Sequence, residues 1–532
     1  MFKSKFLAMP HWVVTCVSAL ISFHAVAQFD ASRVAKIPDA VAARYPDPVV
    51  LYKTPSLATA RTDFASHDEV LAYLRQLSGT SGHWLRLELV GKSQQGRDIP
   101  LLQLSPPSGF QHNRPTVLIL GQQHGNEPAG GEAALALAEQ LVTTQRSLLE
   151  RVNVLILPRA NPDGAQNFMR ATANGLDVNR DHLLLQTPEA RAIAATALRF
   201  SPHVVMDLHE FTVGGRWLDK LAAYAKYDAL LQAATVGNMD AAVSDLALRE
   251  FVGKARTALE RQNLSVFWYH TSSTDPKDAV VSMGGVQPDT GRNVYGLLHA
   301  VSILIETRGV GLGRAHLARR VHSHVVASLA VIQSAAEQGA GLMTAIKAAG
   351  DAAAAKACEG ELVISAQASP GRETLQFVDA VSGADRAVEV EWRSALQLSV
   401  NRARERPCGY WLAASQTEAA SKLRALGVQL QPVTQERRVQ AQRYRVLTEK
   451  GGQRLDARGA IAANAAIREV TVDLERFEKL LPAGGWYVPM NQPMANLVAA
   501  ALEPDSQNSY VANHVLELSD ASYVRVVQSV LP

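Results

Sequence analysis

The stretch Pro115-Thr116-Val117-Leu118-Ile119-Leu120 runs directly into Gly121-Gln122-Gln123-His124-Gly125-Asn126-Glu127-Pro128. The first part is a short, largely apolar run, which is typical of a strand buried on both faces of a sheet. The second part is polar and predicts a loop after the strand. A segment rich in Ala, Leu and Glu follows over residues 130–145 and predicts a helix. The order strand, loop, helix is the repeating unit of α/β sheets.

The same unit recurs along the chain. Apolar runs at residues 152–157, 203–208 and 301–305 predict three more buried strands. Thr187-Pro188-Glu189 predicts a helix start, because threonine caps a helix and proline suits its first position. A long helix is expected from His316 to about Gln338. This alternation predicts an α/β sheet that helices cover on both faces.

The pattern changes after this region. Residues 339–355 are rich in Ala and Gly and predict a connection or a loosely packed helix. Short β-prone runs follow, and Val388-Glu389-Val390-Glu391-Trp392 alternates strictly, which predicts a strand with one solvated face. We therefore expect a main domain over residues 28–340 and a smaller β-rich or α+β C-terminal accessory domain over residues 356–532.

The N-terminus has the features of a targeting segment. Lys3 and Lys5 precede an apolar stretch from about Trp12 to Phe23, and Ala25-Val26-Ala27 forms a small-x-small cleavage pattern. The alternative is a membrane anchor, but the apolar run is shorter than the roughly 20 residues of a transmembrane helix. The sequence predicts a cleaved signal peptide over residues 1–27. The mature protein would then be secreted or periplasmic and would have no membrane span.

The charge balance excludes some classes of partner. The chain has 53 Lys and Arg against 50 Asp and Glu, a formal net charge of +3, and no long basic run. Binding to nucleic acid or to an anionic membrane would need a concentrated basic surface. We expect no nucleic-acid partner.

Three cysteines are present. Cys16 lies in the predicted signal peptide, which leaves Cys358 and Cys408. An exported protein with two cysteines can close one disulfide. The alternative is two separate buried thiols, and the spacing of the pair does not resemble a metal site.

Polar side chains follow three of the predicted strands. His124 and Glu127 come after the first, His209 after the third, and Glu306 after the run at residues 301–305. Ligands bind at the carboxyl ends of strands in open α/β sheets. A catalytic zinc ion commonly takes two histidines and one carboxylate, and a carboxylate that is not a ligand can take a proton from water.

Each of these features has an alternative interpretation when taken alone. A His-x-x-Glu pair occurs by chance on many surfaces. His209 could be a capped strand-end histidine, and Glu306 could pair with Arg308. Their joint occurrence after apolar strands favours one metal site, held by His124, Glu127 and His209.

The intervening sequence identifies a family. Asn161-Pro162-Asp163-Gly164 is followed by Arg170 and then by Gly175-Leu176-Asp177-Val178-Asn179-Arg180-Asp181. In this order, together with the His and Glu residues above, the chain resembles the zinc carboxypeptidase family over about residues 65–340. The resemblance implies a mixed, mostly parallel central sheet, one bound zinc ion and a peptide substrate with a free C-terminal carboxylate.

The resemblance also implies roles for individual residues. It makes His124, Glu127 and His209 the three zinc ligands. It makes Glu306 the general base and later proton donor, and Arg170 the group that polarises the scissile carbonyl and stabilises the oxyanion.

The remaining implied roles concern the substrate and the scaffold. Asn179 and Arg180 resemble the pair that grips the terminal carboxylate, which an arginine can bind in a bidentate fork. Asp177 resembles the carboxylate that orients the first zinc histidine. Residues 161–164 are expected to form a structural turn near the site.

One part of the family pattern does not transfer. Relatives of the digestive type carry a mobile tyrosine upstream of the catalytic glutamate, and Tyr295 is much nearer Glu306 than that tyrosine would be. Arg292 in the same stretch could contact substrate or form a structural salt bridge.

The leading hypothesis is zinc-dependent release of C-terminal residues from peptides. An alternative is a deacylase or amidase that acts on N-acyl amino acids or cell-wall peptides. A third is a non-catalytic binding protein that uses the same cleft. The retained Glu306 argues against the third, because a silent relative commonly loses this glutamate or a zinc ligand.

Overall fold

The fold is built on an eight-stranded sheet, as seen in a computed structural model that describes residues 29–456, 458–460 and 466–528. The predicted signal peptide, residues 1–27, lies outside the described residues. The strands lie in the order β1-β2-β4-β3-β5-β11-β7-β8. Their bounds are β1 Leu85–Lys92, β2 Asp98–Leu104, β3 Thr116–Gly121, β4 Asn153–Leu157, β5 Val204–Thr212, β7 Ala229–Ala233, β8 Val266–Trp268 and β11 Val301–Val310.

The middle of this sheet is parallel. β4, β3, β5 and β11 all run in the same direction, whereas β1 and β2 on one side and β7 on the other pair in the antiparallel sense. The four parallel strands are those predicted from apolar runs. The predicted mixed, mostly parallel sheet is therefore confirmed.

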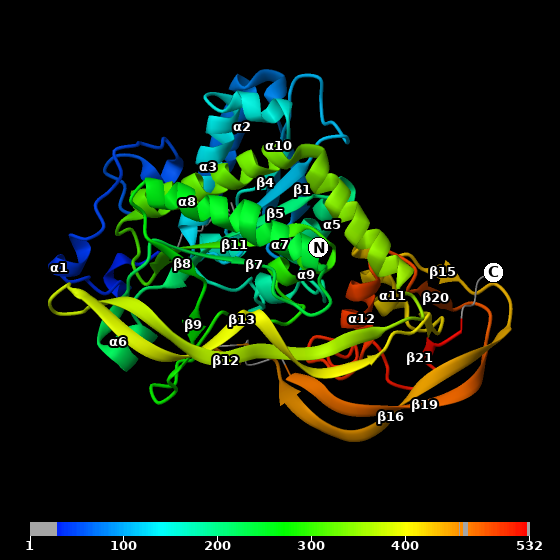
Figure 1. The fold of residues 1–532 in the computed structure, drawn as a ribbon. Coiled ribbons are helices and arrows are strands. Elements are labelled where there is room, and N and C mark those ends of the chain that lie inside the picture. Colours follow the sequence, from blue (N-terminus) through cyan, green and yellow to red (C-terminus); the bar gives the residue numbers. More distant parts are fainter. Residues whose placement is uncertain (1–28, 457, 461–465, 529–532) are drawn as a thin grey trace, which may run out of the picture.

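Helices cover both faces of the sheet, as predicted (Figure 1). Val117 and Ile119 of β3 pack in one core with α3 Pro128–Val142 and α10 Leu317–Ala355. Leu118 and Leu120 point the other way, into a second core with α5 Pro188–Phe200 and α9 Gly291–Leu297. Successive side chains of a strand alternate between faces, so one apolar run supplies both cores. The other helices are α1 Asp39–Ala42, α2 His67–Thr80, α4 Pro162–Gln166, α6 Arg216–Leu221, α7 Ala241–Leu246, α8 Gly253–Arg261, α11 Thr417–Ala425 and α12 Ala495–Leu502.

The closing helix is interrupted next to its predicted end near Gln338. α10 continues to Ala355, with a kink at Gly339, where φ is 48° and ψ is −122°. Glycine adopts this left-handed region without a steric penalty, so the chain kinks there and the Ala-rich stretch resumes the helix. No helix in the described part of the chain, α10 included, combines enough length and apolar character to cross a membrane.

The C-terminal region is β-rich, as predicted, and two long ribbons dominate it (Figure 1). In the first ribbon, β12 and β13 also pair with β6 and β10, so strands from before and after α10 share one five-stranded sheet. The second ribbon, β16 and β19, belongs to a six-stranded sheet. The division of the chain at residues 340 and 356 remains a prediction. The strand bounds are β6 Ala223–Ala225, β9 Thr271–Ser272, β10 Val280–Ser282, β12 Glu361–Asp379, β13 Asp385–Glu405, β14 Gly409–Leu412, β15 Gln431–Pro432, β16 Arg437–Gln453, β17 Leu455–Asp456, β18 Gly459–Ala460, β19 Ala466–Leu481, β20 Trp486–Pro489 and β21 Tyr523–Val526.

A disulfide closes the first ribbon at its base. Cys358 and Cys408 are bonded and lie 50 residues apart in the sequence. The bond joins the segment after α10 to the residue before β14, and the whole of β12 and β13 lies between. The disulfide alternative for these two cysteines is confirmed.

This bond should contribute measurably to stability. A Cys358→Ala/Cys408→Ala variant is expected to lower the free energy of unfolding by ~2–4 kcal/mol, because the cross-link restricts the unfolded chain. Urea denaturation monitored by tryptophan fluorescence measures the change. Reductant should shift the wild-type midpoint and leave the variant unchanged. An unfolding midpoint that is the same in both proteins without reductant would contradict the prediction.

Candidate metal centre

The register of three parallel strands brings the predicted site residues together. In β3 and β5, Gly121 lies opposite Leu208, and in β5 and β11, His209 lies opposite Glu306. The loop after β3 carries His124 and Glu127. Sequence-distant side chains therefore meet at one edge of the sheet, as expected.

His124, Glu127 and His209 form one buried cluster. One ligand atom from each residue lies within 4.8 Å of the other two, and no other group of this kind was found in the described part of the chain. The two Nδ1 atoms of the histidines lie 2.9 Å apart. Glu127 places Oε1 2.9 Å from the Nδ1 of His124 and Oε2 2.9 Å from the Nδ1 of His209.

Carboxylates hold the outer nitrogens of both histidines. His124 Nε2 lies 2.9 Å from Asp177 Oδ1, and His209 Nε2 lies 2.7 Å from Asp207 Oδ1. A carboxylate on the outer nitrogen keeps the proton there and turns the lone pair of Nδ1 inward. Asp177 therefore lies where the family resemblance places it, although its role remains a prediction.

This arrangement fits a zinc ion. Two inward lone pairs and a carboxylate are three hydrogen-bond acceptors, and they face one another without solvent. Such a group is unfavourable unless a cation or a proton lies between its members. Two nitrogens and one oxygen are also the ligand set of a catalytic zinc ion, with a position left open.

Charges around the cluster agree with this interpretation. Burial disfavours the imidazolium of His209, but the carboxylates of Asp207 and Glu127 raise its pKa to about 10. Burial opposes ionisation of Glu127 as well, yet His124 and His209 hold its pKa well below the usual range. In the absence of metal, a proton on His209 can supply the positive charge that the acceptors require.

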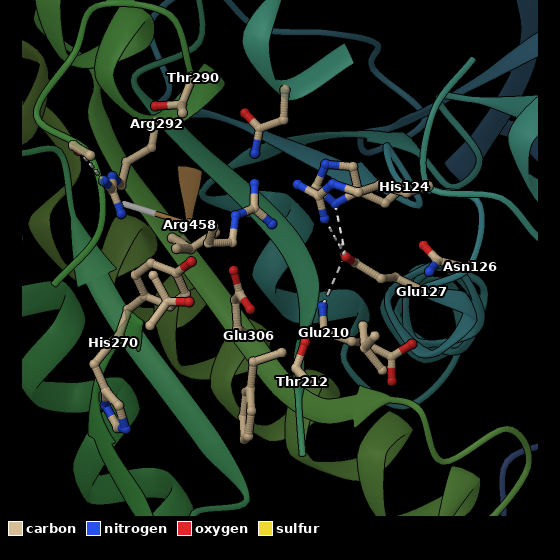
Figure 2. A pocket seen from close by; sticks show the side chains of 18 of the residues that line it. His124, Asn126, Glu127, Glu210, Thr212, His270, Thr290, Arg292, Glu306 and Arg458 are labelled. Atoms are coloured by element: carbon tan, nitrogen blue, oxygen red, sulfur yellow. Dashed lines mark hydrogen bonds and ion pairs between the residues drawn. The ribbon is translucent and has the colours of Figure 1, made fainter. Parts of the chain in front are cut away.

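Glu306 points into the pocket beside the cluster (Figure 2). Burial raises the pKa of its carboxyl to about 7, and Glu127 adds to the effect, whereas His209 and Arg170 oppose it. A carboxyl with such a pKa exchanges protons readily near neutral pH.

Arg170 lies on the other side of the cluster. Its Nε and Nη2 donate to Asp177 Oδ2 at 3.1 and 2.9 Å, and its Nη1 donates to Glu127 Oε1 at 3.1 Å. The guanidinium lines the pocket and is half-buried. Asp177 thus contacts both the first histidine and this arginine.

Comparison with known proteins finds similarity to one family. The family described as zinc carboxypeptidase matches residues 70–200. Carboxypeptidase 2 of Trichophyton equinum is 27% identical over 470 residues, which cover 86% of this chain and 85% of that protein. The probable carboxypeptidase 2 of Arthroderma benhamiae is 33% identical over 285 residues, 52% of this chain; the match spans about half of that relative, 54% of its length. This chain is similar to the zinc carboxypeptidase family.

A solved structure of a metallo-carboxypeptidase from Pseudomonas aeruginosa is also similar to this chain. It shares 18% sequence identity, with a TM-score of 0.39, over 51% of this chain and 70% of its own.

The expected carboxylate-binding pair of the family has a partner that the sequence did not predict. Asn179 is buried, accepts a hydrogen bond from Gly291 N at 2.9 Å and lies with its Nδ2 3.0 Å from His209 Nε2. Arg180 donates from Nη1 to its neighbour's carbonyl and lies with Nη2 2.5 Å from Asp456 Oδ2. Asp456 comes from the C-terminal region, far beyond residues 70–200, which match the family model.

Several residues in or next to the pocket were missed from the sequence. Asp207 could have been found, because it is an acid in an apolar strand two residues before His209 and therefore shares its face. Tyr269, Arg216 and Arg458 also line the pocket, and no motif marks them. Burial and the nearby Glu306 raise the pKa of Tyr269 to about 12.

The structure places Tyr295 and Arg292, whose roles the sequence left open. Tyr295 is buried in the second core, whereas Tyr269 is the tyrosine that lines the pocket. Arg292 lines the pocket as well and donates to Gly285 O at 2.9 Å, a neutral acceptor.

The segment at residues 161–164 supports the metal-binding loop. The predicted turn is the start of the short helix α4, which Asn161 caps by accepting from Gly164 N at 2.9 Å. Asn161 also donates to Gln123 O at 3.1 Å, next to the first histidine. A Cβ on Gly125 would lie 1.8 Å from the carbonyl carbon of Gly164, so the two backbones touch at this point.

Gly125→Ala should therefore damage the metal centre. We expect a loss of ~1–3 kcal/mol in unfolding free energy, because a backbone must move to admit the methyl group. Displacement of the neighbouring ligands should weaken zinc binding by ~10–100-fold. Urea denaturation and zinc titration against a competing chelator measure both effects.

Gly371→Ala is the matched control, because a Cβ there meets no atom within 4 Å. Its stability and zinc affinity should stay close to those of the wild type. Wild-type zinc affinity in Gly125→Ala would contradict the assignment of this contact.

Proposed function

We propose that this chain is a zinc-dependent carboxypeptidase that releases C-terminal residues from peptides. The single observation that carries the proposal is the register that sets Glu306 opposite His209, beside the buried cluster of His124, Glu127 and His209. Similarity to the zinc carboxypeptidase family supports it independently.

In the proposed mechanism, His124, Glu127 and His209 hold the zinc ion. When bound, zinc supplies Lewis acidity, which polarises a carbonyl group and acidifies water. Asp177 and Asp207 keep the histidine rings oriented through their outer nitrogens. Buried side chains with fixed hydrogen bonds lose little entropy when substrate binds.

Glu306 handles the proton in this proposal. Its carboxylate takes a proton from the attacking water and later delivers it to the nitrogen of the leaving amine. A base works best when its pKa is near the working pH, and burial raises the pKa of Glu306 to about 7.

Arg170 and the Asn179–Arg180 pair would bind the substrate. Arg170 lines the pocket next to Glu127, so its guanidinium can stabilise the negative charge that develops on the scissile carbonyl oxygen. Asn179 and Arg180 line the same pocket, where they would hold the terminal carboxylate.

We also propose that the protein acts after export. The support is the sequence of residues 1–27, with its basic start, apolar stretch and Ala-Val-Ala site. Sequencing the N-terminus of the mature protein tests this, and Gln28 is the expected first residue.

A substrate panel tests the activity. The purified protein with zinc should release single residues from the C-termini of peptides, should leave C-terminally amidated versions intact, and should lose this activity when a chelator removes zinc. Product identification by mass spectrometry is the measurement. Turnover of N-acyl amino acids or cell-wall peptides alone would contradict the proposal and favour a deacylase or amidase.

Glu306→Gln tests the proposed base. We expect kcat to fall by ~10²–10⁴-fold, because the amide cannot accept the proton, while zinc stays bound at one ion per chain. Peptide-release kinetics and metal analysis measure the two outcomes. Glu150→Gln, at an exposed glutamate, is the matched control. Wild-type kcat in Glu306→Gln would disprove the assignment of the base.

A further inference from the structure

A hairpin of the C-terminal region reaches the active-site pocket. β17 and β18 flank Arg458, whose side chain lines the pocket together with Glu127 and Glu306. In Figure 2 the labelled Arg458 lies among these side chains, next to Glu306. The hairpin lies about 150 residues beyond Glu306 in the sequence.

Asp456 fixes the position of this arginine. Its Oδ2 lies 2.8 Å from Arg458 Nη2 and 3.2 Å from Arg458 Nε, and Arg180 Nη2 lies 2.5 Å from the same oxygen. One carboxylate thus serves two guanidiniums. Among the described residues, no other carboxylate lies within ion-pair distance of Arg458.

Two further arginines of the pocket, Arg216 and Arg292, donate hydrogen bonds only to neutral groups within the described part of the chain. Arg216 donates to the hydroxyl of Thr271 at 3.1 Å and to the carbonyl of Ser272. Arg292 is buried and donates to Gly285 O at 2.9 Å. Burial lowers the pKa of Arg292 to about 10, which reflects the cost of keeping a charge in this place.

Three acids line the pocket, Glu127, Glu210 and Glu306, and of these only Glu306 remains to balance these charges. Glu210 is committed to Arg320, with which it forms a buried ion pair at 2.6 Å. Glu127 faces the metal cluster, and its negative charge is used there. The substrate-facing side of the pocket is therefore positive, and a buried cation is stable when an anion pairs with it.

A peptide with one terminal carboxylate supplies one anion, whereas the pocket presents more than one unmatched guanidinium. We propose that the pocket selects peptides whose terminal residue has an acidic side chain, and that Arg458 is a specificity-determining residue that binds one of the two substrate carboxylates. Asp456 acts as a positioning residue, because it holds the Nε and Nη2 edge of Arg458. Nη1 is left to meet the substrate. This inference depends on the carboxypeptidase activity proposed above.

Peptides that differ only in their last residue test the proposal. Glu and Gln have the same shape and differ in charge, and Lys reverses the charge. The wild-type holoenzyme should have a kcat/KM at least about 30-fold higher for the Glu peptide than for the Gln peptide, as expected for loss of one buried charge pair. The Lys peptide should be the poorest substrate.

Arg458→Gln should bring the Glu and Gln values close together, and Arg458→Lys should restore part of the difference. The ratio compares two substrates on one preparation, so a lower folded fraction does not alter it. Arg445→Gln is the matched control, since Arg445 is an exposed arginine of the same region that pairs with Asp473. It should keep the wild-type ratio.

The outcomes separate this inference from the proposed activity. Equal turnover of the Glu and Gln peptides by the wild type, or preference for Lys, would overturn the selectivity while leaving the carboxypeptidase activity intact. An unchanged Glu-to-Gln ratio in Arg458→Gln would overturn the role of Arg458. Release from none of the peptides would overturn the proposed activity and this inference together.

Discussion

The site depends on the register of three parallel strands. Backbone hydrogen bonds between β3, β5 and β11 place the ends of these strands at one edge, with His209 opposite Glu306. A slip of one residue would turn each side chain to the other face of the sheet. The two apolar cores prevent such a slip, because both faces of β3 and β5 are buried.

Burial then sets the electrostatics of the site. Two inward-facing histidines and a glutamate exclude solvent from one small volume, so their charges have to be balanced by specific partners. Asp177 and Asp207 supply negative charge behind the histidines, and Arg170 supplies positive charge to Asp177 and Glu127. Among the described residues, no basic side chain forms an ion pair with Glu306, and burial raises the pKa of its carboxyl to about 7. Burial therefore makes the cluster depend on its charged partners and raises the pKa of the proposed base.

The C-terminal region takes part in the architecture of the pocket. Its strands β12 and β13 extend a sheet that includes β6 and β10, and its hairpin brings Asp456 into contact with Arg180. Through this contact Arg180, which is expected to bind the substrate carboxylate, already pairs with Asp456. The charge pattern of the pocket is thus a joint property of two regions that are far apart along the chain, and the proposed substrate selectivity follows from that joint pattern.

The sequence by itself determined the parallel strands, the cluster of His124, Glu127 and His209, and the position of Glu306, because apolar runs and the polar residues that end them are local features. It did not determine the flanking strands β1, β2 and β7, whose mixed patterns lack a strong apolar run. It located the interruption of the long helix near Gln338, where α10 kinks at Gly339, but left open whether residues 339–355 form a connection or a helix. Only the tertiary structure decided that Tyr269 and Arg458 line the pocket, that Tyr295 does not, and that Asp456 contacts Arg180. Contacts across hundreds of residues depend on how sheets and ribbons pack, and no local pattern in a single sequence encodes them.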